Sequence, residues 1–117
     1  MNLKNKKCIP CEGGIPKLTP QEIKKYLAQV PGWEEKSGKI YKKFKFKNFV
    51  EAMKFVNRIA EIAEEEGHHP DFSVHYNEVN ITIWTHSIGG LSENDFILAA
   101  KIDGALGGLL MEPAGGT

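Results

Sequence analysis

The sequence has few cysteines, no long apolar run and no excess charge of either sign. It contains two cysteines among 117 residues, and 15 basic side chains balance 15 acidic ones. This balance gives no overall field that would attract nucleic acid or an anionic membrane. No apolar run approaches the roughly 20 residues that span a bilayer, and the N-terminus lacks the apolar stretch of a secretory signal. We therefore expect a cytoplasmic protein that binds neither nucleic acid nor a membrane.

The two cysteines, Cys8 and Cys11, form a C-x-x-C pair near the N-terminus. A zinc site normally needs a second pair or added histidines, and a redox pair normally opens a helix that follows a strand. Gly13, Gly14 and Pro16 follow this pair instead. The pair is interpreted as part of an incidental or mobile arm, and a metal site completed by another subunit or a reversible disulfide stays an open alternative.

Helical and strand periodicities alternate along the chain. Helix starts are predicted at Thr19, Asn48 and Ser92, because each is followed three residues later by an acidic side chain that can complete a capping box. Alternating apolar and polar residues predict β-hairpins over residues 33–47 and 72–85. The order α-β-β-α-β-β-α predicts an α+β fold, in which a four-stranded antiparallel sheet has three helices packed on one face.

The length predicts a single folded domain with an extension at each end. We assign residues 1–17 to an N-terminal arm and residues 18–103 to the domain. Residues 104–117 form a Gly-rich tail that we expect to fray.

Side-chain spacing also predicts which faces are buried. In the second hairpin Val79, Ile81 and Ile83 share one face, and Asn77 is expected to take the left-handed turn position. Lysines at positions 43, 45 and 47 are expected to lie on a solvated face and not to form a phosphate site. Helical spacing in the second helix predicts a core stripe. Its members are Phe49, Met53, Val56, Ile59, Ala60 and Ala63.

Three of the four histidines stand at the ends of predicted elements, where reactive side chains commonly collect. His68 and His69 follow the second helix, and His86 follows the last strand. Imidazole titrates near physiological pH, so such a cluster can divide the roles of acid and base. Simpler roles stay open, since a His-His pair can cap a helix and His86 can bond to the backbone. His75 alternates with apolar residues and is expected on the exposed sheet surface.

Two carboxylates are candidates to support these histidines. Glu64 lies four residues before His68 and would share a helix face with it. Asp95 lies three residues after Ser92, where helix capping is a sufficient role. Three histidines with either carboxylate could hold zinc. Adjacent histidines rarely point both rings at one ion, however, and no H-x-H or H-E-x-x-H spacing occurs. We therefore expect no metal.

Several separated motifs follow one another along the chain. They are Leu18-Thr19-Pro20, Gly32-Trp33, Glu64 with His68-His69-Pro70, Tyr76-Asn77-x-Val79, and Thr85-His86-x-x-Gly89-Gly90-Leu91-Ser92 with Asp95. Taken together, these motifs resemble the signature of the pterin-4a-carbinolamine dehydratases. The resemblance covers roughly residues 18–103 and implies the fold predicted above. It implies dehydration of a 4a-hydroxytetrahydropterin to the quinonoid dihydropterin during tetrahydropterin recycling, without metal or organic cofactor, by a homodimer or homotetramer.

The same resemblance implies a role for each site residue. His68 and His86 are the acid and base candidates, in an order that is left open, and His69 belongs to the catalytic set as the group that positions the substrate. Glu64 and Asp95 would orient or tune the imidazoles. The substrate-binding residues implied are His69, Phe72 and Trp33.

The chain departs from animal relatives at two positions. Gly67 stands where those relatives often have an acidic residue, and Phe72 stands where they have tryptophan. The first departure affects the tuning of the imidazoles and the second affects packing around the pterin. Neither removes a histidine.

Two other functions are considered. Members of this family also act as non-catalytic dimerisation or assembly partners, including as transcriptional coactivators, and such a role would tolerate loss of the histidines. Metal-dependent hydrolysis is the other alternative. The complete set of histidines favours the dehydratase, which would be a hydro-lyase.

Overall fold

The computed structural model describes residues 3–9 and 15–111 of the 117-residue chain. Helices and strands alternate in the order that the sequence predicts. In chain order the elements are η1 (Leu3–Asn5), α1 (Pro20–Leu27), β1 (Glu34–Lys36), β2 (Lys39–Lys45), α2 (Phe49–Glu66), β3 (Asp71–His75), β4 (Glu78–Ile83), η2 (His86–Ile88) and α3 (Glu93–Gly104), where η marks a short 3-10 helix.

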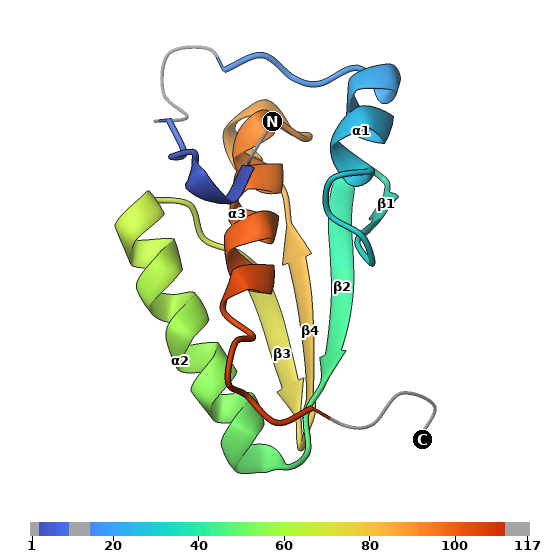
Figure 1. The fold of residues 1–117 in the computed structure, drawn as a ribbon. Coiled ribbons are helices and arrows are strands. Elements are labelled where there is room, and N and C mark those ends of the chain that lie inside the picture. Colours follow the sequence, from blue (N-terminus) through green and yellow to red (C-terminus); the bar gives the residue numbers. More distant parts are fainter. Residues whose placement is uncertain (1–2, 10–14, 112–117) are drawn as a thin grey trace.

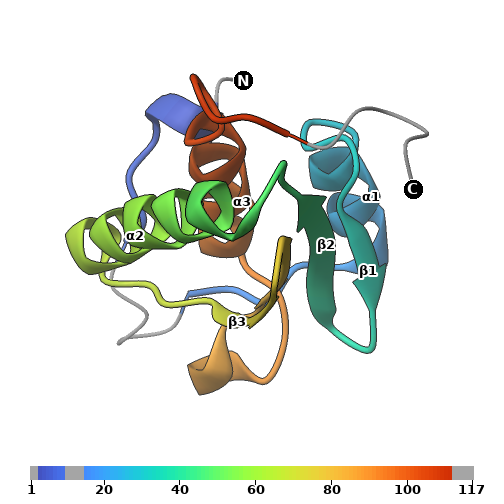
Figure 2. The same ribbon diagram turned by 90° about the horizontal axis from the view of Figure 1, so that it is seen from below.

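The four strands form one antiparallel sheet in the order β1-β2-β4-β3. The long α2 and α3 lie across one face of this sheet, and α1 covers its β1–β2 side (Figures 1 and 2). Val79, Ile81 and Ile83 of β4 point into the layer between sheet and helices and are at most 1% exposed. The predicted α+β fold is confirmed. Within the described ranges, no helix is long and apolar enough to cross a membrane.

The predicted helix starts are correct, but one cap works differently. Thr19 and Glu22 form the expected reciprocal capping box at α1. At α2, Asn48 accepts a hydrogen bond from the Glu51 N–H, whereas the Glu51 carboxylate accepts one from the Leu110 N–H at 2.9 Å. This bond from Leu110, with the Lys54 ammonium, holds the pKa of Glu51 below its usual value. Glu51 therefore anchors the C-terminal segment and does not close a capping box.

The predicted core stripe of α2 is only partly correct. Val56, Ile59 and Ala63 are buried, but Phe49 is 49% exposed and Ala60 is also exposed. The buried face is rotated around the helix so that it also includes two residues that the prediction left out. These are Ala52 and Phe55, both fully buried.

The turn between β3 and β4 lies one residue earlier than predicted. Tyr76, with φ of 55°, takes the left-handed conformation that was expected of Asn77. Asn77 instead forms two hydrogen bonds with the backbone of Phe46. Its side-chain Nδ2 donates to the Phe46 carbonyl at 2.8 Å, and its backbone carbonyl accepts from the Phe46 N–H. The amide of Asn77 thus fixes the end of β2 against the hairpin.

Both chain extensions pack onto the domain wherever they are described. Leu3, in the arm, is 3% exposed, and Leu109, after α3, is 9% exposed. Arg58 donates to the carbonyls of Ala105 and Gly107 at 2.8 and 2.7 Å. Residues 3–9 and 104–111 thus make specific contacts with the domain, and fraying of the tail and mobility of the arm stay predictions. Residues 112–117 lie outside the described part of the chain, as does Cys11.

Candidate functional site

One pocket of about 360 Å³ lies where α2 ends, β3 begins and η2 follows β4. Its volume falls in the range of roughly 300–1,000 Å³ that is usual for small-molecule sites. All three histidines predicted to be catalytic line it, from two segments that are distant in sequence. The lining residues are Gly67, His68, His69, Pro70, Asp71, Trp84, His86 and Ser87.

Gly67 delivers the histidine pair to this pocket. It ends α2 in the left-handed conformation, with φ of 66°, and its N–H still donates to the Ala63 carbonyl. A Cβ at this position would meet nothing within 4 Å, so the demand for glycine comes from the backbone conformation and not from crowding. The reversal turns the chain off the helix axis, and His68 enters the interior directly after it.

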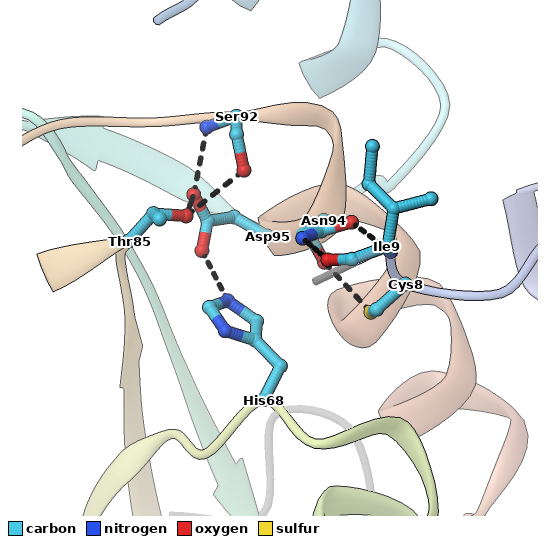
Figure 3. Close-up of polar contacts among 7 residues, drawn as sticks. All are labelled: Cys8, Ile9, His68, Thr85, Ser92, Asn94 and Asp95. Atoms are coloured by element: carbon cyan, nitrogen blue, oxygen red, sulfur yellow. Dashed lines mark hydrogen bonds and ion pairs between the residues drawn. The ribbon is translucent and has the colours of Figure 1, made fainter. Parts of the chain in front are cut away.

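His68 is buried and held by a carboxylate from another helix (Figure 3). Its Nε2 lies 2.6 Å from Oδ1 of Asp95, and the two side chains are 8% and 0% exposed. A carboxylate only accepts hydrogen bonds, so this contact places the proton on Nε2. The Nδ1 of the neutral ring is then the nitrogen that can take up a proton.

The Asp95 carboxylate is itself fixed by two further donors. Its Oδ2 accepts from the Thr85 hydroxyl at 2.9 Å and from the Ser92 N–H at 2.8 Å. Thr85 uses its only hydroxyl proton for Asp95, so the Ser92 hydroxyl, 2.9 Å away, is the donor in the contact between Ser92 and Thr85. This buried network joins the end of β4, the start of α3 and the end of α2, and it holds the His68 ring in one orientation.

His69 forms a second histidine–carboxylate pair, and it does so at the surface. Its Nε2 lies 2.6 Å from Oε2 of Glu64, with the side chains 60% and 79% exposed. The sequence predicted that Glu64 would lie on the same face as His68. Because Gly67 reverses the chain, Glu64 meets His69 and Asp95 meets His68.

His86 is exposed and stacks on Trp84, which stands on the solvent face of the sheet. The two ring centroids are 4.0 Å apart with the planes inclined by 26°. The Lys39 ammonium lies 4.6 Å from the centroid of the same indole. The indole Nε1 of Trp84 is buried and has no hydrogen-bond partner among the described residues. Buried donors are nearly always paired in native proteins, so this N–H is an exception within the site.

The two aromatic residues predicted to bind substrate are not among the pocket-lining residues. Trp33 is 5% exposed, and its indole N–H donates to Asp103 at 3.1 Å. That is a position in the core, and we do not retain Trp33 as a substrate contact. Phe72 is 47% exposed and directly follows Asp71, which lines the pocket. Its contact with substrate stays a prediction.

The described residues hold no group of three or more His, Cys, Asp or Glu side chains placed to bind a metal ion. The arrangement is suited instead to proton transfer. A buried, oriented imidazole and an exposed one face the same cavity, and these are groups that can donate and accept protons near neutral pH.

Sequence reasoning missed two contributions to the site. Trp84 was not among the predicted site residues, yet it forms a wall of the pocket. Thr85 was not given a role, although it is 1% exposed and bonds to Asp95. A signal for Thr85 was available, because a polar residue on the apolar phase of a strand is buried and needs a partner.

Fold and site together define a small α+β protein with a pocket lined by histidines. Comparison with known proteins then gives the family. A profile described as "Pterin 4 alpha carbinolamine dehydratase" matches residues 16–105, and the chain belongs to this family. A protein of Rickettsia canadensis, provisionally named a pterin-4-alpha-carbinolamine dehydratase, is 55% identical over 103 residues, which are 86% of this chain and 94% of that protein. A relative from Halorhodospira halophila with the same provisional name is 50% identical over 92% of this chain and 99% of its own length.

Solved structures show the same fold in proteins described in different ways. A crystal structure from Brucella melitensis, described as a transcriptional coactivator/pterin dehydratase, superposes with a TM-score of 0.76 at 35% identity, over 79% of this chain and 100% of that one. A pterin dehydratase-like protein described as a RuBisCO assembly factor in the alpha-carboxysome has a TM-score of 0.55 at 26% identity. It covers 64% of this chain and 87% of its own.

Proposed function

We propose that this protein is a 4a-hydroxytetrahydropterin dehydratase that works by histidine acid–base catalysis, with His68 and His86 as the reacting groups. One observation supports this above all. His68, held by Asp95, and His86, stacked on the Trp84 indole, line the same pocket although 17 residues lie between them in the sequence. The family membership of the chain supplies the substrate class.

The reaction needs two proton transfers. The C4a–O bond breaks as one imidazolium protonates the departing hydroxyl, which leaves as water. The other imidazole accepts the proton from N5, and the N5–H electrons form the new C4a=N5 double bond of the quinonoid dihydropterin. Exchange with solvent then resets both rings. Each transfer is worth about 10²–10⁴-fold in rate when the group is well placed.

The surrounding residues support binding and orientation. Trp84 and the His86 ring stacked on it form an aromatic wall of the pocket, against which the bicyclic ring of a pterin can pack. His69 and Asp71 line the rim, where their polar groups can meet the ring substituents of the substrate. His68 needs no further help to keep its tautomer, because Asp95 fixes it.

The test is stopped-flow dehydration of a synthetic 4a-carbinolamine. We expect the wild-type protein to accelerate the reaction and to show a bell-shaped dependence on pH with two ionisations. His68→Ala and His86→Ala should each reduce turnover by about 10²-fold or more. His75→Ala is the matched control, since His75 is exposed on β3 and does not line the pocket. Unchanged turnover in both site variants would overturn the assignment.

A second function, as an assembly or coactivator partner without catalysis, is favoured by a different region. Large apolar side chains are exposed around the connection from β2 to α2, the β3–β4 turn and the segment after α3. They are Phe49, Val50, Tyr76, Leu110 and Met111, between 38% and 66% exposed. Figure 1 shows the β2–α2 connection at the opposite end of α2 from the end that leads into the pocket-lining residues. Exposed apolar groups that gather in one region commonly mark a contact with another protein.

These two functions can be separated experimentally. Substitution of Phe49 and Val50 by serine should leave turnover unchanged if the pocket acts alone, and should abolish partner capture or self-association if this end is an interface. Sedimentation of the wild-type protein would test the homodimer or homotetramer that we propose for the family fold. The cytoplasmic location stays a prediction, which fractionation of the source cell would test.

A further inference from the structure

The N-terminal arm contacts Glu66 and Asn94, which lie close in sequence to the buried pair of His68 and Asp95. The arm lies outside the region that the family profile matches. The profile begins at residue 16, whereas the described arm comprises residues 3–9. Leu3 is 3% exposed and seats η1 against α3. η1 contacts Lys101 near the C-terminal end of α3, and Cys8 and Ile9 lie beside Asn94 in the first turn of α3 (Figure 3). The arm is thus a packed part of this protein that the family signature does not describe.

The backbone of Ile9 forms two hydrogen bonds with the side chain of Asn94, the residue that precedes Asp95. Its backbone N–H donates to Oδ1 of Asn94 at 2.9 Å, and its carbonyl accepts from Nδ2 of the same amide at 2.7 Å. The Cys8 thiol lies 3.6 Å from the Asn94 carbonyl. Asn94 is 2% exposed, so these bonds are shielded from water, and both halves of its amide are used by one residue of the arm.

Cys8 makes the corresponding contact on the other helix. Its N–H donates to Oε1 of Glu66 at 2.9 Å. The Glu66 side chain is 2% exposed, and its other oxygen lies 3.6 Å from the Lys101 ammonium and 4.0 Å from the Lys7 ammonium. Glu66 is the last residue of α2 and stands two positions before His68. The arm therefore bonds to the helix end that delivers His68.

The two contacts come from consecutive amides and join two helix ends. The Cys8 amide binds the C-terminus of α2, just before His68, and the Ile9 amide binds the N-terminus of α3, just before Asp95. We propose that the amides of residues 8 and 9 form a clip between the end of α2 and the start of α3, and that this clip fixes the distance and orientation of the His68–Asp95 hydrogen bond. The arm is then a positioning element of the dehydratase site. This inference rests on the proposed function for its effect on turnover.

The physical consequence follows from the geometry of that bond. The contact is 2.6 Å long and joins the segment that follows α2 to the first turn of α3. A misplacement of about 1 Å at a reacting group can lower a rate as much as 10²-fold. The arm residues do not line the pocket, so loss of the clip should lower kcat and leave KM nearly unchanged.

Ile9 allows a matched pair of variants, because the clip uses only its backbone. Its side chain is 58% exposed. Ile9→Pro removes the N–H that Asn94 accepts, whereas Ile9→Ala retains it. We expect Ile9→Pro to lower kcat about tenfold or more, within the range seen for misplaced catalytic groups, with KM unchanged. Ile9→Ala should behave as wild type.

A spectroscopic signal reports on the clip independently of turnover. The ring N–H of His68, bonded to Asp95 and shielded from water, should give a downfield proton resonance that exchanges slowly with solvent, and Asp95→Asn assigns it by its loss. We expect the resonance to weaken and exchange faster in Ile9→Pro and to persist in Ile9→Ala. If the wild-type protein has no dehydratase activity, the proposed function fails. The resonance in Ile9→Pro and Ile9→Ala then still tests whether the arm fixes the His68–Asp95 hydrogen bond.

A second variant, Asn94→Ala, keeps the inference testable if Ile9→Pro fails to fold. Asn94→Ala removes both bonds to Ile9, including the one that Ile9→Pro breaks. Ile9→Pro added to it should therefore cause little further loss. A folded Ile9→Pro or Asn94→Ala protein that keeps the wild-type kcat and the slowly exchanging resonance would show that the arm only covers the surface. Additive losses in the double variant would equally contradict a single clip.

Discussion

Two histidine–carboxylate pairs stand side by side in this protein with the same separation and opposite surroundings. In both, Nε2 lies 2.6 Å from a carboxylate oxygen. His68 and Asp95 are 8% and 0% exposed, whereas His69 and Glu64 are 60% and 79% exposed. The distance therefore says little about what either pair contributes, and the surroundings decide it.

Burial changes both the strength of such a pair and the consequence of breaking it. At the surface, water screens the charges and competes for the hydrogen bond, so the pair contributes little. In the interior, the same contact is stronger, and each group that loses its partner is left without water to replace it. The buried pair can thus hold a ring in one orientation, while the exposed pair leaves its ring free to move.

The largest effect should come from breaking the buried pair. Asp95→Ala leaves the His68 ring N–H, the Thr85 hydroxyl and the Ser92 N–H without their acceptor. We expect a loss of about 3–5 kcal/mol in the free energy of unfolding, measured by urea denaturation. Glu64→Ala is the control from the exposed pair. Equal losses in the two variants would show that burial does not separate them.

A second buried carboxylate, that of Glu66, extends the comparison, because its contribution to stability depends on pH. Burial by itself raises the pKa of Glu66, but the Cys8 N–H and the ammonium groups of Lys101 and Lys7 outweigh burial and hold the pKa below the ordinary 4.5. A lowered pKa stabilises the fold above about 4.5, and this contribution is lost as the pH falls through the folded-state value.

The measurement is urea denaturation of the wild type and Glu66→Gln over a range of pH. The difference in unfolding free energy between them should be largest near neutral pH and shrink in acid. Glu65→Gln is the control, because Glu65 is 69% exposed and contacts Lys7 only at 3.8 Å. A wild-type advantage over Glu66→Gln that grows in acid would contradict the assignment.

The smallest effect should come from the exposed pair. Glu64→Gln should change the free energy of unfolding by about 0.5 kcal/mol or less, and added salt should remove even that difference. Thermal denaturation at low and high salt checks both points. A loss comparable with that of Asp95→Ala would mean that the surface pair is structurally coupled to the buried one.

The fold was accessible from the sequence because its signals are local. Thr19 and Glu22 are three residues apart and close their capping box within one turn of helix. Val79, Ile81 and Ile83 alternate with polar residues, which marks the buried face of β4 without reference to any other element. In α2, two apolar lines overlap at Val56, Ile59 and Ala63, and hydrophobicity alone could not decide whether Phe49 or Phe55 turns inward.

The candidate site was only partly accessible. In the sequence, His68, His69 and His86 stand at the ends of predicted elements, and in the structure all three line one pocket. The sequence pattern paired Glu64 with His68, however, because a helical count continues through Gly67, whereas the chain reverses there. It also gave no role to the arm, since nothing near Ile9 in the sequence indicates a partner 85 residues away.

The sequence by itself determined the order of elements, their caps and the buried face of the sheet, because those depend on neighbours within a few residues. Only the tertiary structure decided which carboxylate holds which histidine and what lies behind them. The His68–Asp95 contact spans 27 positions and the Cys8–Glu66 contact spans 58. Such contacts arise when packing brings separate elements together, and their partners leave no periodic trace in the chain.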